Sequence, residues 1–254
     1  MWWFMNGISI LMYHQVGDFP PMKLHRASYT NLAQFRRHLA LLRHWRANVL
    51  SMSEALSALR GERPIPPRAV VLTFDDGYRS FFTDAVPLLR EYGFPAIVYV
   101  LAARAGDAAD WYAVDGQPTP PLMQWSEVRQ LPALGIEVGS HGLQHTRLAG
   151  LGAGILRAEL AGSRKLIEDQ LGLAVPHFCY PFGSVDQAAI DACAAAGYST
   201  AVTCQRGAAR AGLDPLALPR KSVRQGDDVA ALLWKLYMKN PLKGAPMQRS
   251  AKAA

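Results

Sequence analysis

The sequence predicts an α/β fold in which helices cover a parallel sheet. Apolar runs that suit strands alternate with segments of helical periodicity along the whole chain. Most of these runs are continuously apolar, which is typical of strands buried on both faces and therefore of parallel sheets. The residues alone leave open whether this sheet is open or closed into a barrel.

The elements follow one another in a regular order. The helix over 31–46 begins after a capping Thr30 or Asn31 and carries apolar residues at three- and four-residue steps. Glycines at 61, 93 and 172 mark the expected ends of three further helices. We expect strands at 8–13, 69–74, 96–101, 136–140, 177–180, 199–203 and 216–223. We expect helices at 31–46, 51–61, 80–92, 126–131, 153–171, 186–196 and 227–239, and a long loop at 102–122.

Length and composition indicate one domain of moderate size. The chain has 254 residues, half of them hydrophobic, which suffices for a sizeable core. Residues 235–254 carry five Lys or Arg and no acid, so much of the net charge of +7 lies there. We expect a single domain at 1–240 and a basic, flexible tail at 241–254. The first interpretation of a basic tail is a solvated chain end, and the second is a segment that contacts anionic lipid. Nucleic acid is not an expected partner, because no basic stripe with interleaved aromatics occurs.

The cysteines and the N-terminus indicate in which cellular compartment the protein is expected. Three cysteines without a CxxC pair exclude a disulfide framework and a cysteine zinc site. The apolar start, "MWWFMNGISILMYHQV", lacks a basic segment and a small-residue cleavage site, so it does not resemble a signal peptide. We therefore expect a cytoplasmic location, with the inner face of the membrane as the alternative.

Side chains able to do chemistry follow four of the expected strands. His14 follows the first strand, Asp75 and Asp76 follow 69–74, and "HGLQH" follows 136–140. The turn "PFG" follows 177–180. Because the carboxyl ends of parallel strands share one face, we expect these groups to converge.

The adjacent carboxylates imply a cation. Two buried like charges in contact repel each other unless a proton or a metal compensates them. His141 and His145 are four residues apart, so one helical turn would place both imidazoles on one face. Two neutral imidazoles and one carboxylate form an open three-ligand set for Zn²⁺ or a similar ion. One Asp would then bind the metal and the other would act as a base. Taken singly, an Asp pair before Gly is often a turn and an HxxxH spacing is often coincidence, so their joint placement carries the prediction.

The motifs "TFDDG", "SHGLQH" and "YPFG", in this order, resemble those of the metal-dependent polysaccharide deacetylases. The resemblance covers roughly residues 8–225. It implies a distorted (β/α) barrel of about seven parallel strands and a catalytic domain over 1–240. It also implies that Asp75 is the base and that Asp76, His141 and His145 bind one divalent metal ion. Zn²⁺ is the expected ion, with Co²⁺, Ni²⁺ or Fe²⁺ as alternatives.

Two residues of the family pattern are absent from this sequence, so other residues would have to take their roles. Cys179 stands where the family has an Arg, and the late Leu-x-His motif is absent. "LMYHQV" resembles the permuted poly-N-acetylglucosamine deacetylases, in which a histidine on this early strand takes over the acid role, and this implies His14. Arg220 could orient Asp75 in place of the missing Arg.

The mechanism that the resemblance implies is metal-assisted amide hydrolysis of an N-acetylated sugar. Asp75 would take the proton of a metal-bound water, and His14 would protonate the leaving amine. A backbone N–H in the "YPFG" turn, that of Tyr180, would hold the oxyanion. The aromatic residues proposed to wall the sugar site, with the rest of that turn, are Trp111, Tyr112, Trp125, Pro181, Phe182 and Gly183.

The substrate and the function class have alternatives. The glycan could be an exopolysaccharide, a lipopolysaccharide sugar or a lipid-linked precursor. One rival is a non-catalytic sugar-binding protein on the same fold. Another is a Mg²⁺-dependent phosphotransferase with an aspartyl nucleophile, which fits less well because "DDG" lacks Asp-x-Asp spacing and two histidines suit Zn²⁺ better than Mg²⁺.

Overall fold

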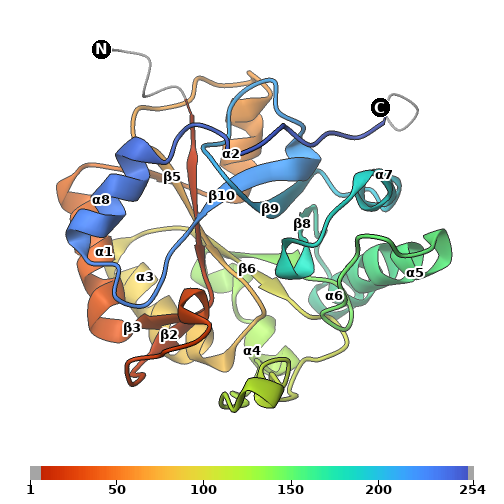
Figure 1. The fold of residues 1–254 in the computed structure, drawn as a ribbon, viewed down its shortest axis with the longest axis horizontal. Coiled ribbons are helices and arrows are strands. Elements are labelled where there is room, and N and C mark those ends of the chain that lie inside the picture. Colours follow the sequence, from red (N-terminus) through yellow and green to blue (C-terminus); the bar gives the residue numbers. More distant parts are fainter. Residues whose placement is uncertain (1–6, 251–254) are drawn as a thin grey trace.

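The computed structural model describes residues 7–250, which form a barrel of parallel strands surrounded by helices (Figure 1). The strands are β1 (Ser9–Tyr13), β2 (Gln15–Gly17), β3 (Tyr29–Asn31), β4 (Asn48–Leu50), β5 (Ala69–Phe74), β6 (Ala96–Val100), β7 (Ile136–Ser140), β8 (His177–Cys179), β9 (Thr200–Arg206) and β10 (Leu218–Ser222). The helices are α1 (Leu32–His44), α2 (Met52–Leu59), α3 (Val86–Tyr92), α4 (Trp125–Val128), α5 (Ala153–Arg157), α6 (Ser163–Leu171), α7 (Gln187–Ala195) and α8 (Val229–Met238). Two π-helical turns, Phe81–Ala85 and Ala158–Gly162, lead into α3 and α6.

Seven strands close the barrel, in the order β1, β10, β9, β8, β7, β6 and β5. Strand β1 pairs with both β10 and β5, so the first and last strands of the chain are neighbours. Strand β4 pairs with the first half of β5, and β6 pairs with its second half. Two strands therefore share one edge of β5, which distorts the barrel. The predicted distorted barrel of about seven parallel strands is confirmed.

Alternate residues of the strands face two different apolar layers. Ile10, Val71 and Ile97 belong to a cluster inside the barrel. Their neighbours in sequence, such as Leu72 and Val98, belong to the larger cluster between the strands and the helices. Burial on both faces explains why the strands are continuously apolar in sequence.

Helix α2 covers the amino-terminal end of the barrel. Met52 belongs to the interior cluster, and its backbone N–H donates to Glu137 on β7. The Ser53 hydroxyl lies 3.0 Å from Nε2 of His177, at the start of β8. Since this end is closed, the opposite, carboxyl-terminal end is left for a site.

The remaining differences from the predicted elements are local. Strands β2, β3 and β4 were not predicted, and each has only three residues. The predicted helix over 153–171 is continuous but contains a π-helical turn. His38, on α1, is buried, and its Nδ1 atom lies 3.1 Å from the Tyr13 hydroxyl.

Residues 243–249 of the predicted basic tail make contacts with the barrel. The amide of Gln205 donates to the backbone carbonyls of Lys243 and Ala245. Arg249 makes an ion pair with Asp214 at 3.1 Å, and Met247 packs on the core. The apolar start at residues 1–6 and the last four residues lie outside the described part. Among residues 7–250, no helix has the length and apolar character that crossing a bilayer requires.

Candidate active site

The candidate site lies at the carboxyl-terminal end of the barrel. His14 follows β1, Asp75 and Asp76 follow β5, and His141 follows β7. The backbone N–H of Asp75 donates to the Tyr13 carbonyl at 3.0 Å, which holds the ends of β1 and β5 together. Strand pairing thus brings residues from distant parts of the sequence to one place, as the sequence predicted.

Asp76 and the two histidines of "HGLQH" form a compact buried cluster. The Asp76 Oδ1 atom lies 3.1 Å from Nε2 of His141 and 3.3 Å from Nε2 of His145. All three side chains are buried. Burial opposes the charge on Asp76, but His145 and His141 outweigh it and hold the pKa of this carboxyl well below its ordinary value. Burial lowers the pKa of His145, which favours the neutral imidazole that a metal ion requires.

The chemistry of this cluster fits a metal ion. The Nδ1–H of His141 donates to the Cys179 carbonyl at 2.8 Å, because a carbonyl can only accept. In the neutral ring, Nε2 then directs its lone pair at the Asp76 carboxylate, so two acceptors face each other at 3.1 Å. Such an arrangement is stable when a metal ion lies between the two atoms, or when a proton on Nε2 makes the contact a hydrogen bond. A hydrogen bond from the second ring nitrogen to a carbonyl is also usual for a metal-binding histidine.

A second set of candidate ligands, Asp75, His141 and Cys179, fits less well. Burial raises the pKa of the Cys179 thiol well above its ordinary value, so it stays protonated. Both carboxylate oxygens of Asp75 are already bound by Arg220. The set with Asp76 is therefore the candidate metal site.

The histidines converge through a loop, so the predicted helical turn is wrong. Residues 141–148 form no helix, and Gly142 and His145 have φ angles of +85° and +63°. Glu159, in the π-helical turn, accepts the Leu143 N–H at 2.7 Å and the Thr146 hydroxyl at 2.8 Å. Glu159 thus fixes the loop between the two histidines, and no sequence motif marked it.

Backbone strain is concentrated at this site. Six non-glycine residues among 7–250 have positive φ, and three of them are Asp76, His145 and Phe182. Positive φ is uncommon outside glycine and persists only where the surroundings enforce it. The backbone here is held in a geometry that its residues do not favour by themselves.

Arg220 lies where Asp75 needs a cation. Its guanidinium binds both Asp75 oxygens, at 2.6 and 2.7 Å, and it also donates to the Thr203 carbonyl and the Thr73 hydroxyl. Arg220 is 1% exposed and Asp75 3%. Burial opposes ionisation of Asp75, but Arg220 outweighs it and holds the pKa of the carboxyl below its ordinary value. Arg220 also lies 3.2 Å from the Cys179 sulfur, so its guanidinium reaches the side chain that stands at the family's Arg position.

His14 also lies beside Asp75. Its Nε2 atom lies 3.8 Å from Asp75 Oδ2. Its Nδ1 atom is buried without a hydrogen-bond partner among the described residues, so no neighbour fixes which nitrogen carries the proton. The structure thus brings the His14 imidazole and the ionised Asp75 carboxylate together beside the candidate metal site.

The "YPFG" turn differs from its expected role. The Tyr180 N–H, which we expected to hold an oxyanion, donates to the Val202 carbonyl at 3.2 Å as part of the strand pairing. The Phe182 N–H in the same turn has no hydrogen-bond partner in residues 7–250. The Phe182 ring lies 4.1 Å, centre to centre, from that of His145, and the guanidinium of Arg147 lies over the Phe182 ring at 4.0 Å.

The expected aromatic wall is only partly present. The Trp111 ring lies 4.3 Å from His145, and its Nε1 atom is buried without a partner among the described residues. Tyr112 stacks on His25 at 3.9 Å. Trp125 packs against the core at the start of α4, and its assignment to the sugar site stays a prediction.

Comparisons with known proteins agree with this arrangement. A family model described as "Polysaccharide deacetylase" matches residues 62–201. Among similar proteins, YxkH of Bacillus subtilis is 26% identical over 219 residues, which is 86% of this chain and 72% of YxkH. The poly-beta-1,6-N-acetyl-D-glucosamine N-deacetylase of Escherichia coli K12 is 30% identical over 143 residues, which is 55% of this chain but only 21% of that enzyme.

Solved structures share the fold at low identity. The deacetylase PplD of Streptococcus pyogenes superposes with a TM-score of 0.78 at 23% identity, covering 91% of this chain and 99% of PplD. IcaB from Ammonifex degensii gives 0.77 at 23% identity, covering 91% of this chain and 97% of IcaB. The matched stretch 62–201 contains Asp75, Asp76 and both cluster histidines, whereas His14 and Arg220 lie outside it. With more than half of its length matched, the chain belongs to the polysaccharide deacetylase family.

Proposed function

We propose that this protein removes N-acetyl groups from an N-acetylated glycan, with Asp76, His141 and His145 holding one Zn²⁺ ion. The observation that carries the proposal is the buried Asp76–histidine cluster directly beside an ionised Asp75. Two imidazoles and one carboxylate form the usual open ligand set of catalytic zinc. When bound, such an ion polarises an acyl carbonyl and brings the pKa of a coordinated water to about 7.

Asp75 would act as the general base. Its two oxygens are fixed by Arg220, so the carboxylate is charged and has one orientation before substrate arrives. General bases contribute a factor of about 10² to 10⁴ in rate.

His14 would act as the general acid toward the leaving amine. Its Nε2 atom lies 3.8 Å from Asp75 and the side chain is partly exposed, so it can reach a substrate that enters from the carboxyl end of the barrel. The Phe182 N–H would donate to the oxyanion in place of Tyr180, because it is the donor in this turn that the strand pairing leaves unused.

The substrate class is an N-acetylglucosamine-type glycan. The E. coli relative carries that substrate in its name, and the Trp111 ring, 4.3 Å from that of His145, offers an apolar surface beside the cluster for a sugar. A protein that only binds sugar would not need a strained, buried cluster of metal-binding groups next to a fixed carboxylate.

The test is acetate release from N-acetylglucosamine oligomers by the full chain loaded with Zn²⁺. Asp75→Asn should lower kcat by about 10² to 10⁴ while the bound zinc, measured by elemental analysis, stays at one per chain. His141→Ala should lose both zinc and turnover. The control is His44→Ala, an exposed position at the end of α1, which should retain both. Glycan binding without acetate release by the zinc-loaded wild type would support the sugar-binding alternative instead.

A further inference from the structure

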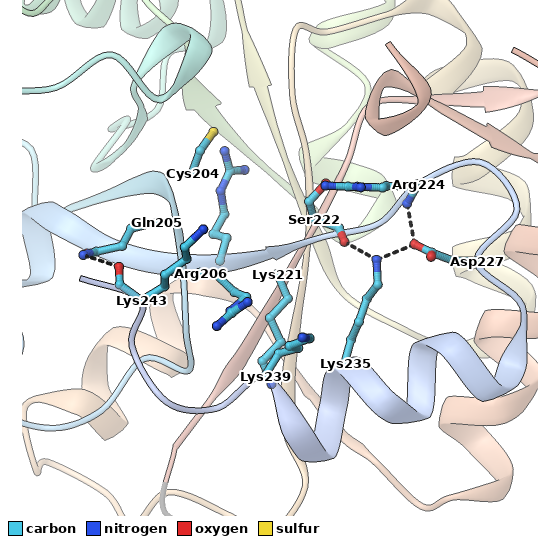
Figure 2. A pocket seen from close by; sticks show the side chains of 11 residues that line it. Cys204, Gln205, Arg206, Lys221, Ser222, Arg224, Asp227, Lys235, Lys239 and Lys243 are labelled. Carbon is cyan, nitrogen blue, oxygen red and sulfur yellow. Dashed lines mark hydrogen bonds and ion pairs between the residues drawn. The ribbon is translucent and has the colours of Figure 1, made fainter. Parts of the chain in front are cut away.

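A basic groove lies on the outside of the barrel between β9, β10 and α8 (Figure 2). It has a volume of about 550 Å³ and is lined by seven Lys or Arg side chains and one acid, Asp227. Three of these cations are already neutralised or enclosed. Arg220 binds Asp75, Lys235 binds Asp227, and Lys221 is buried under α8.

The other four cations have no acidic partner within residues 7–250. They are Arg206, Arg224, Lys239 and Lys243. Arg206, Arg224 and Lys243 are exposed, and Figure 2 shows Lys239 extending from α8 toward the same groove. Four unpaired cations around one hollow repel each other, so the groove is complementary to an anionic ligand.

Helix α8 also presents an apolar face to solvent next to this groove. Trp234, Tyr237 and Met238 are 54%, 48% and 51% exposed, and their spacing of three and four residues places them on one side of the helix. The remaining large exposed apolar residues of the described chain are scattered over other elements, with none on α8. A contiguous exposed apolar face marks an interaction surface, whereas scattered ones do not.

The apolar face and the groove are parts of one surface. The Lys239 ammonium lies 5.8 Å from the centre of the Trp234 ring. The Trp45 indole donates to the Tyr237 hydroxyl at 2.8 Å, and the Arg68 guanidinium lies over Trp45. Aromatic side chains flanked by Lys and Arg are typical of helices that lie in a membrane interface.

We propose that α8 and the basic groove bind an anionic phospholipid membrane, with lipid phosphates in the groove and the Trp234 face in the headgroup layer. The groove contains no aromatic side chain, and the aromatic residues stand on a convex helix. A glycan would favour the reverse arrangement, with aromatic rings inside a groove. The inference does not depend on deacetylase activity, so its failure would leave the proposed function in place.

The test is co-sedimentation of the full chain with vesicles of phosphatidylcholine containing roughly one third phosphatidylglycerol, and with pure phosphatidylcholine. We expect binding to the anionic vesicles only, weaker at about 0.5 M than at about 0.1 M NaCl. Lys239→Glu with Lys243→Glu should weaken binding by at least roughly 25-fold, since each cation near such a surface contributes about fivefold. The matched control is Arg157→Glu with Lys165→Glu, on α5 and α6 at the opposite side of the barrel (Figure 1). It makes the same change in net charge and should bind within about twofold of wild type.

A second pair of variants tests the apolar face. Trp234→Ser should weaken vesicle binding roughly tenfold. Ile155→Ser, at a position 53% exposed on α5, should leave it unchanged. If the charge-reversed variant does not fold, as judged by circular dichroism, Lys239→Gln with Lys243→Gln replaces it with the same expected direction.

Three outcomes would overturn the proposal. The first is equal binding to neutral and anionic vesicles, or equal loss in the matched controls. The second is full displacement from vesicles by inorganic pyrophosphate at about 1 mM, which would indicate a discrete phosphate ligand. The third is retention on polygalacturonate without vesicle binding, which would indicate an acidic glycan.

Discussion

Replacing Arg220 by Met tests whether Asp75 depends on its buried partner. The variant keeps an unbranched side chain that fills part of the space, but it leaves the Asp75 carboxylate buried without the cation that binds it at 2.6 and 2.7 Å. Breaking a buried ion pair from one side costs about 3–5 kcal/mol. A domain of this kind is stable by about 5–15 kcal/mol, so Arg220→Met should remain folded at 25 °C with a much reduced margin.

A double-mutant cycle separates the pair from its surroundings. Removing both charges, with Asp75→Asn and Arg220→Met together, should recover most of the lost stability, because an ion pair replaced as a whole is often nearly neutral. The coupling free energy between the two positions should be about 2–4 kcal/mol. Arg220→Lys should be intermediate, because an ammonium cannot bind both oxygens as a planar guanidinium does.

The pH dependence gives a second readout with a defined sign. The folded-state pKa of Asp75 is depressed, so its contribution to stability is present above the unfolded pKa of about 3.9. That contribution is lost as the pH falls through the folded-state value. The difference between wild type and Arg220→Met should therefore be largest at neutral pH and shrink as the carboxyl is protonated.

The assay is urea unfolding followed by circular dichroism at neutral and acidic pH, with all four members of the cycle and Arg220→Lys. A loss below about 1 kcal/mol in Arg220→Met would refute the argument that the pair is tightly coupled. A double variant as unstable as Arg220→Met would refute it too, because the damage would then come from packing.

Three further predictions concern other parts of the molecule. His14→Gln should lower the rate of acetate release about 10²-fold with zinc content and thermal midpoint unchanged, and near-wild-type turnover would remove His14 from the mechanism. Lys221 is buried among neutral acceptors, and burial lowers its pKa to about 7, below the unfolded value of about 10.4. Wild type should therefore gain stability with rising pH between these values, by on the order of 1 kcal/mol per unit, and Lys221→Met should lose this slope in urea titrations; parallel curves would contradict it. Gly183 has a φ of +64°, and an added Cβ would lie 2.6 Å from that of Cys204, so Gly183→Ala should cost about 1–3 kcal/mol, with an unchanged urea midpoint as the contrary result.

The sequence was most informative where strands are long and buried. Continuous apolar runs such as 69–74 predicted the parallel sheet, and the residues that follow them predicted which side chains would meet. Strand β2 pairs only with β3, and β4 adds only to half of β5, over three residues each. Three residues are too few for a period to be visible, so these strands could not be predicted.

Local conformation at the site could not be read from spacing. Four-residue separation suits a helical turn, but His141 and His145 converge through a loop because Gly142 takes a positive φ and Glu159 binds the loop backbone. Glu159 lies 14 residues after His145, in a helical segment, and no pattern in the sequence links the two residues. Likewise, the Tyr180 N–H is used by strand pairing, which depends on the register of β8 with β9.

The position of β10 between β1 and β9 has a consequence for how the protein is made. Arg220, the cation that neutralises Asp75, is in β10, whereas His14 directly follows β1. A nascent chain that has emerged only as far as residue 201 would hold every residue of the matched family stretch, yet its barrel would be open and Asp75 would lack its counter-charge. The protein should thus become active only late in synthesis, after β10 has left the ribosome and paired with β1 and β9.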